Sequence, residues 1–166
     1  PVYGMGDYIE HLAERVAELA NRPSARKRRG ERQTKRETDL VQRMLRAMLT
    51  MAVRERGTDL HLLSEGGNCL IRCRTDGVLF TMLQLPEIVL RPLISAIKVQ
   101  SDIDISERRK PQDGSFKSMV DDVKLDVRVN TSPTSMGETA SLRLLYRQSV
   151  LRVGEAGHQP SQLRDV

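Results

Sequence analysis

The chain has 166 residues, of which 30% are charged and only 3% aromatic, with a formal net charge of +5. A length of this order accommodates one ordinary core, because domains commonly run about 100 to 150 residues. No run of about 18 apolar residues occurs, nor does a basic start followed by an apolar stretch and a small-residue cleavage site. We therefore expect a cytosolic chain with one core.

Cysteine and histidine usage argues against metal and disulfide chemistry. Cys69 and Cys73 stand four residues apart in a strand-like run, which would separate their Cα atoms by about 13 Å. A disulfide needs Cα atoms within about 7 Å, so both thiols are expected to stay reduced. The three histidines, His11, His61 and His158, show no spacing typical of zinc ligands.

The positive charge is concentrated in one segment. Residues 22–36 contain eight basic residues and one acidic residue, leaving 19 basic against 21 acidic elsewhere. A solvated basic linker is the favoured interpretation, and contact with anionic lipid head groups, worth roughly 1 kcal/mol per charge, is the second. Nucleic-acid binding is less favoured, since the run has no aromatic residue for stacking on bases.

Two helices are predicted in the first third of the chain. Asp7 followed by Glu10 has the outline of a capping box, and apolar residues then recur at helical spacing until Arg22. Thr38 is the expected cap of a second helix, which has one wide apolar face and ends near Gly57. The second helix is expected to cover a sheet.

From Thr58 onward the hydrophobic period changes to two, which predicts strands. Asp76-Gly77 between two strand-like runs is a strong hairpin signal. A helix is expected near Pro92, followed by a loop over residues 102–114 and three further strand-like runs, with Asp121-Asp122 as a turn. The predicted fold class is α+β, a mainly antiparallel sheet covered by helices.

Strand alternation predicts one arginine-rich face on this sheet. Arg72 and Arg74 point to one side of their strand, and the same parity places Arg128 and Arg143 opposite the apolar residues of theirs. Neighbouring carboxylates such as Asp126 could neutralise these arginines at the surface, where an ion pair contributes roughly 0 to 1 kcal/mol. Alternatively, guanidinium groups held on a rigid sheet could grip phosphate oxygens.

No phosphate-binding P-loop of the form G-x-x-x-x-G-K-[ST] occurs in the chain. Two loops carry phosphate-compatible groups: ERRKPQDG, with Arg108, Arg109 and Lys110, and NTSPTSMGE, with hydroxyls and Gly137. Without a P-loop and its lysine, the chain cannot hold Mg-ATP for phosphoryl transfer. We expect it to be catalytically silent by itself.

Four runs taken together carry a family resemblance: GTDLHLL, IRCRTDGVL, LISAIKVQSDIDISERRKPQDG and LDVRVNTSPTSMGETASLRLL. In order and spacing, from about Leu40 to Tyr146, they resemble the segment that precedes the P-loop in type II secretion and type IV pilus assembly ATPases. The resemblance implies a PAS-like domain over residues 38–147. Apolar spacing and charge predict an amphipathic helix over residues 1–21 and a basic linker over 22–37, and the Gly, Pro, Gln and Ser content predicts a loose tail over 148–166, which the resemblance would lead toward an ATPase core. The P-loop, acidic boxes and histidine box would lie beyond Val166.

The same resemblance implies the function and the candidate residues. Its members are hexameric, lie on the cytoplasmic face of the inner membrane, and dock a membrane platform protein, for which residues 1–36 are the candidate contact. Arginines of this domain reach bound nucleotide, so ATP and Mg would belong to the parent protein only. Carried over by position, the candidates are Arg72, Arg74, Arg109, Arg128 and Arg143.

Two other hypotheses stay open at this stage. The chain could be a stand-alone module whose basic run binds anionic lipid or nucleic acid, or a structural adaptor whose arginines are satisfied by local carboxylates.

Overall fold

The computed structural model describes residues 4–22 and 27–147, with side chains described for 4–22 and 34–147. Six antiparallel strands form one sheet in the order β3-β2-β1-β6-β5-β4. Their bounds are β1 Asp59–Glu65, β2 Asn68–Thr75, β3 Val78–Pro86, β4 Gln112–Val120, β5 Val123–Thr134 and β6 Gly137–Tyr146. The predicted α+β class with a mainly antiparallel sheet is confirmed.

The predicted hairpin turns have the backbone that their sequences require. Asp76 and Gly77, between β2 and β3, have φ values of 51° and 78°. Asp121 and Asp122, between β4 and β5, have φ values of 47° and 61°. Two successive positive φ values match the twist of the flanking strands, and Gly, Asp and Asn tolerate them best. Both predicted turns are confirmed.

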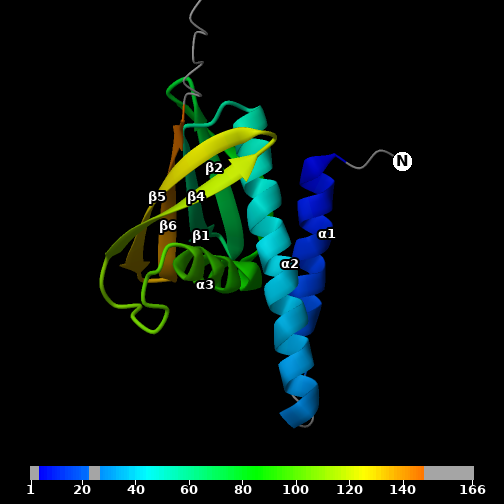
Figure 1. The fold of residues 1–166 in the computed structure, drawn as a ribbon. Coiled ribbons are helices and arrows are strands. Elements are labelled where there is room, and N and C mark those ends of the chain that lie inside the picture. The colour runs from blue at the N-terminus through cyan, green and yellow to red at the C-terminus, as the bar shows by residue number, and fades with distance from the viewer. Residues whose placement is uncertain (1–3, 23–26, 148–166) are drawn as a thin grey trace, which may run out of the picture.

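Helices cover one face of the sheet (Figure 1). α2 (Lys27–Arg54) and α3 (Leu90–Gln100), the latter preceded by the short 3-10 helix η1 (Glu87–Val89), lie against the strands. α1 (Met5–Ala20) runs antiparallel to α2 and packs beside it, with further contacts to β3 and η1. The opposite face of the sheet carries the polar side chains.

The second helix begins earlier than predicted. α2 starts at Lys27, so most of the segment expected to be a basic linker is helical. The Thr38 hydroxyl donates to the Thr34 carbonyl oxygen at 2.9 Å, one helical turn back, and does not cap a helix start. Lys, Arg, Gln and Glu are good helix formers, which explains why this charged stretch continues the helix.

The start of the first helix also differs from the prediction. α1 begins at Met5 with Gly4 as its N-cap residue, whereas the sequence suggested Asp7 as the cap. Asp7 lies in the first turn, where its Oδ2 accepts a hydrogen bond from the Gly4 backbone N-H at 3.0 Å. A carboxylate in the first turn also interacts favourably with the helix dipole.

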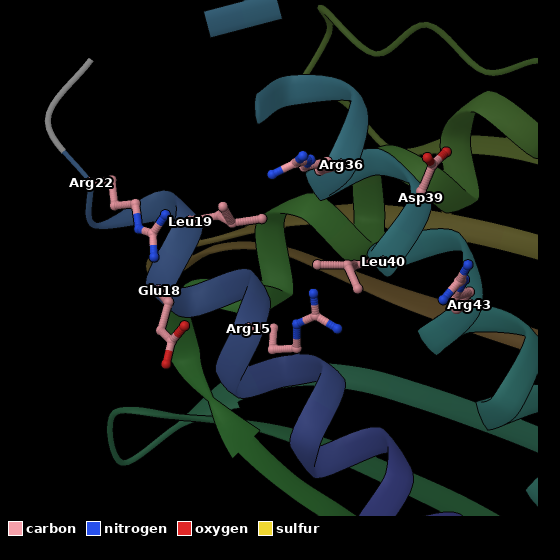
Figure 2. Close-up of a pocket in the computed structure, with 8 residues that line it drawn as sticks. All are labelled: Arg15, Glu18, Leu19, Arg22, Arg36, Asp39, Leu40 and Arg43. Carbon is pink, nitrogen blue, oxygen red and sulfur yellow. The ribbon is translucent and has the colours of Figure 1, made fainter. Parts of the chain in front are cut away.

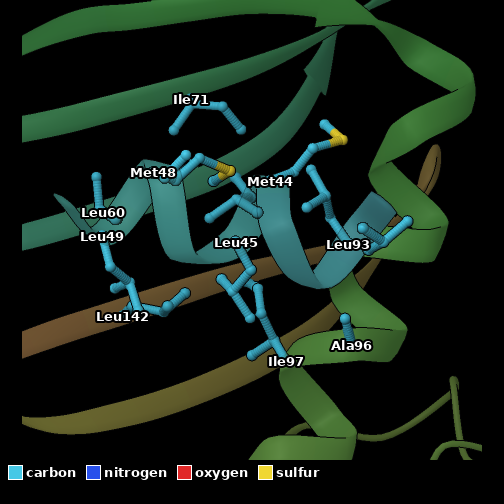
Figure 3. Packing of buried hydrophobic residues seen from close by; sticks show 14 of the residues in the cluster. Met44, Leu45, Met48, Leu49, Leu60, Ile71, Leu93, Ala96, Ile97 and Leu142 are labelled. Carbon is cyan, nitrogen blue, oxygen red and sulfur yellow. The ribbon is translucent and has the colours of Figure 1, made fainter. Parts of the chain in front are cut away.

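The core lies between the helices and the sheet (Figure 3). Met44, Leu45 and Met48 of α2 are at most 1% exposed and meet side chains from both α3 and the strands. Burial of each such side chain contributes about 1.5–3 kcal/mol relative to leaving it in water. α1 adds a second apolar stripe, formed by Ile9, Leu12, Ala13 and Val16. Because this core fixes α2 and α3 on one face, the arginines are left on the other.

Within residues 4–22 and 27–147, no helix is long and apolar enough to cross a membrane.

Candidate nucleotide-contacting face

Three of the predicted arginines lie in one row across the sheet. Strand pairing places Arg74 opposite Asp59, Asp59 opposite Arg143, and Arg143 opposite Arg128. Neighbouring strands lie about 4.8 Å apart, so this arginine row spans about 14 Å from β2 to β5. The arginine row is therefore compact: its three arginines come from β2, β6 and β5, and β1 contributes Asp59 between Arg74 and Arg143.

The members of the row differ in their partners. Arg143 Nε donates to Asp59 Oδ1 at 3.2 Å, and Arg74 Nη1 donates to the Gly77 carbonyl oxygen at 2.9 Å. Within the part of the chain that the structure describes, Arg128 is exposed and has no hydrogen bond or ion pair. Arg128 is thus the member of the row most available to an external anion.

Arg72 lies in the next row along the strands, opposite His61. Its Nη2 donates to Glu65 Oε2 at 2.7 Å, and its side chain is half-buried. His61 Nδ1 in turn lies 3.0 Å from Ser141 Oγ. Since a carboxylate already holds Arg72, binding an anion there would require that ion pair to be broken or shared.

Arg109 lies apart from the other four arginines. It belongs to the loop before β4 and contributes to a pocket at the β5–β6 turn, with Thr134 and Met136. Gly137 is six residues from Arg143 along β6, a separation of about 20 Å. The structure therefore brings together Arg74, Arg128 and Arg143, with Arg72 beside them, and does not bring Arg109 to them.

A buried ion pair anchors the loop that carries Arg109. Lys98 is 1% exposed, and its Nζ lies 2.7 Å from Glu138 Oε2 and donates to the Glu107 carbonyl oxygen at 2.7 Å. The contact with Glu138 is an ion pair without hydrogen-bond geometry. Gln112 Nε2 also donates to the Glu107 carbonyl oxygen, at 3.0 Å. The two loops noted in the sequence are therefore joined through α3.

A hollow of about 650 Å³ lies beside Arg128, and two further cations line it. These are Lys117 of β4 and Arg147, which follows β6. Neither was singled out from the sequence, although alternation along β6 places Arg147 on the same side as Arg143. Arg147 could have been predicted by continuing the strand alternation one residue beyond Tyr146.

Asp126 supplies the negative charge in this hollow. Arg147 Nε donates to Asp126 Oδ2 at 2.7 Å, and this bond is the main cause that lowers the pKa of the Asp126 carboxyl. Lys117 and Arg128 add only a longer-range attraction to this carboxylate, and within the described residues neither side chain forms an ion pair of its own. The hollow is suited to a small anion on electrostatic grounds.

The thiols and acidic groups give no sign of another kind of site. Cys69 and Cys73 are free and buried, and burial raises the pKa of the Cys69 thiol to about 12. A thiol with such a pKa is a poor nucleophile near neutral pH. Among the described residues, no group of three or more His, Cys, Asp or Glu side chains is placed to hold a metal ion.

Comparison with known proteins identifies a matching family and several relatives. The family model described as Type II/IV secretion system protein matches residues 34–166. Type II secretion system protein E of Klebsiella pneumoniae is 42% identical over 125 residues, which cover 75% of this chain and 25% of the relative. Type II secretion system protein HxcR of Pseudomonas aeruginosa is 36% identical over 124 residues, covering 74% and 26%.

The chain thus spans about a quarter of the length of the curated relatives that it matches. The match includes the three strands that carry the arginine row, the strand of Asp59 and both loops noted in the sequence. The resemblance drawn from the motif order is confirmed, and the chain belongs to the type II/IV secretion system protein family.

Proposed function

We propose that this chain is the non-catalytic N-terminal portion of an ATPase that powers type II secretion or type IV pilus assembly, and that its arginine row contacts nucleotide held by an ATPase core. The observation that carries the proposal is the alignment of Arg74, Arg143 and Arg128 in one register row with only Asp59 between them. Like charges on directly paired strand positions are unfavourable unless an anion is near.

Arg128 is the principal phosphate contact in this proposal. It is exposed, it lines a hollow, and within the described residues its side chain forms no hydrogen bond or ion pair, although its charge attracts that of Asp126. Guanidinium groups bind phosphate oxygens through paired N-H donors, and such charge-assisted bonds are stronger than neutral ones. Arg143 and Arg74 would add positive charge beside Arg128. Arg72 would contact nucleotide only after its ion pair with Glu65 is broken. Arg109, which lies 3.8 Å from Glu107, would contact nucleotide from a separate loop.

The parent protein would supply the remaining parts. ATP and Mg would bind in its ATPase core, which would contain the P-loop that this chain lacks. The proposed partners are that core, neighbouring subunits of a homohexamer, and an inner-membrane platform protein that docks on residues 1–36, with an anionic membrane surface as a further contact. The proposed location is cytoplasmic, on the face of the inner membrane, and residues 38–147 are proposed to be PAS-like.

The experiment compares ATP hydrolysis by the parent protein carrying Arg128→Ala with that of the unchanged parent. We expect kcat/KM to fall at least about tenfold, which corresponds to about 1.4 kcal/mol of lost transition-state stabilisation. Lys124→Ala is the matched control, because Lys124 lies on the same strand and the same face, exposed, but outside the hollow. Unchanged activity in Arg128→Ala would contradict the proposed nucleotide contact.

A structural adaptor that never meets nucleotide is the second candidate, and two observations favour it. Arg72 is paired with Glu65 and Arg143 with Asp59, as local neutralisation requires. An adaptor predicts that Arg128→Ala leaves ATP hydrolysis unchanged while contacts between domains or subunits weaken. Measuring activity and hexamer assembly on the same variant therefore separates the two candidates.

A further inference from the structure

The two antiparallel helices α1 and α2 carry the same eight-residue pattern. Residues 15–22 read RVAELANR and residues 36–43 read RETDLVQR, so both have the form R-x-x-[E/D]-L-x-x-R. In a helix, positions i, i+3, i+4 and i+7 share one face. Each segment therefore presents two arginines, one carboxylate and one leucine on a single face.

The structure places these two faces around one pocket (Figure 2). The pocket measures about 410 Å³ and is lined by the eight pattern residues, Arg15, Glu18, Leu19, Arg22, Arg36, Asp39, Leu40 and Arg43. Because the helices run in opposite directions, each end of the pocket receives one arginine from each helix. Figure 2 shows Arg22 and Arg36 toward one end, and Arg15 and Arg43 toward the other. The site thus has an approximate two-fold arrangement.

The charges in this pocket do not satisfy one another. No hydrogen bond or ion pair involves the side chains of Arg15, Arg22, Arg36 or Arg43 within the described parts of the chain. Glu18 and Asp39 are the carboxylates of the lining, so four cations face two anions. Leu40 is 6% exposed and gives the pocket an apolar side between its charged ends. An excess of two positive charges is left at the site.

We propose that this pocket binds a small soluble anion that carries two or more phosphate groups. A guanidinium group can hold two phosphate oxygens at once, so an arginine pair at each end matches a ligand with separated phosphate charges. The carboxylates lie between the arginines along each helix and would direct the anion toward the pocket ends. This site is distinct from the arginine row of the sheet and does not depend on the function proposed for that row.

The geometry favours a soluble anion over a membrane surface. Basic residues that bind a lipid surface lie on one exposed side of an element, where each charge can reach the head groups. Here the arginines come from two helices and line a common pocket. An anion small enough to enter the pocket can be contacted by arginines of both helices. A flat layer of lipid head groups would contact only the arginines at the rim of the pocket.

The test uses the 166-residue chain and inorganic pyrophosphate, titrated by calorimetry at low and at about 0.15 M ionic strength. We expect saturable binding that weakens with salt, and weaker binding of orthophosphate. The double variant Arg15→Gln/Arg43→Gln should lose at least about tenfold in affinity, since one cation is removed from each helix. Glutamine is a good helix former, so the helices should persist, which circular dichroism checks.

The control variant Arg46→Gln/Lys124→Gln removes the same charge at exposed positions outside the pocket, and its affinity should change less than about twofold. Methyl NMR signals of Leu19 and Leu40 should shift with pyrophosphate. Absence of binding, equal losses in both variants, or shifts confined to other methyl groups would overturn the proposal. So would binding to phosphatidylglycerol vesicles that depends on Arg15 and Arg43 while pyrophosphate does not bind, because the ligand would then be a lipid head group.

Discussion

Arg128 and Arg143 lie directly opposite each other on β5 and β6, and of the two only Arg143 forms an ion pair with a carboxylate among the described residues. That partner, Asp59, lies 84 residues away in the chain. Like charges at directly paired strand positions destabilise a sheet by roughly 0.2–1 kcal/mol. The charge of Arg128 is therefore compensated within the sheet only by its longer-range attraction to Asp126.

Removing the side chain of Arg128 should not destabilise the isolated chain. For Arg128→Thr we expect the free energy of unfolding in urea to rise by about 0.2–1 kcal/mol, because the repulsion from Arg143 disappears and threonine suits a strand. Arg143→Thr also removes the contact with Asp59, so its effect should lie nearer to zero. A loss of more than about 1 kcal/mol in Arg128→Thr would show that Arg128 has a structural role.

Breaking the buried ion pair between Lys98 and Glu138 should lower the free energy of unfolding much more. Lys98→Met leaves Glu138, whose side chain is 11% exposed, without its cation, and leaves the Glu107 carbonyl oxygen without the Lys98 donor. Breaking a buried pair on one side costs about 3–5 kcal/mol, so we expect a loss of that size in chemical denaturation. Arg54→Met is the control, because Arg54 and Asp121 form an exposed pair expected to contribute less than about 1 kcal/mol.

Gly114 should not tolerate a side chain. A Cβ atom there would lie 2.7 Å from Ile103 Cγ1 and 2.8 Å from the Ser101 carbonyl oxygen, and the backbone oxygen cannot move aside easily. Gly114→Ala should therefore lower the free energy of unfolding by about 1–3 kcal/mol. In contrast, Gly6→Ala meets only ordinary contacts beyond 3.8 Å in α1 and should stabilise by up to about 1 kcal/mol. Thermal unfolding should show a lower melting temperature for Gly114→Ala and a higher one for Gly6→Ala.

The acid titration of Asp126 should depend on Arg147. The hydrogen bond from Arg147 lowers the pKa of Asp126, so the contact stabilises the fold above the ordinary pKa of an aspartate and is lost as pH falls through the lowered value. In Arg147→Gln the pKa of Asp126 should move up toward its ordinary value, as followed by carboxyl carbon NMR. Lys124→Gln, which removes a cation that does not shift this pKa, should leave the titration unchanged.

Local chemistry predicted much of the fold and part of the site. Asp76-Gly77 and Asp121-Asp122 indicated their turns, because few residues accept successive positive φ values. Strand alternation placed Arg72, Arg74, Arg128 and Arg143 on one face, because the side-chain period of a strand is two. The helix starts were predicted less well: Thr38 and Asp7 were taken as caps, whereas α2 begins at Lys27 and α1 at Met5. Capping signals also occur inside helices, where such side chains bond to the backbone one turn away.

The sequence by itself thus determined the family, the order of the strands along the chain and the shared face of Arg72, Arg74, Arg128 and Arg143. Only the tertiary structure decided which arginines meet. The pairing of β1 with β6 brings Asp59 to Arg143, and the register of β5 on β6 brings Arg128 into the same row. These pairings join segments far apart in the chain, and their register is set by which apolar side chains fit beneath α2 and α3. The alternation of side chains along a strand does not predict which strands pair or in which register, because it describes each strand alone.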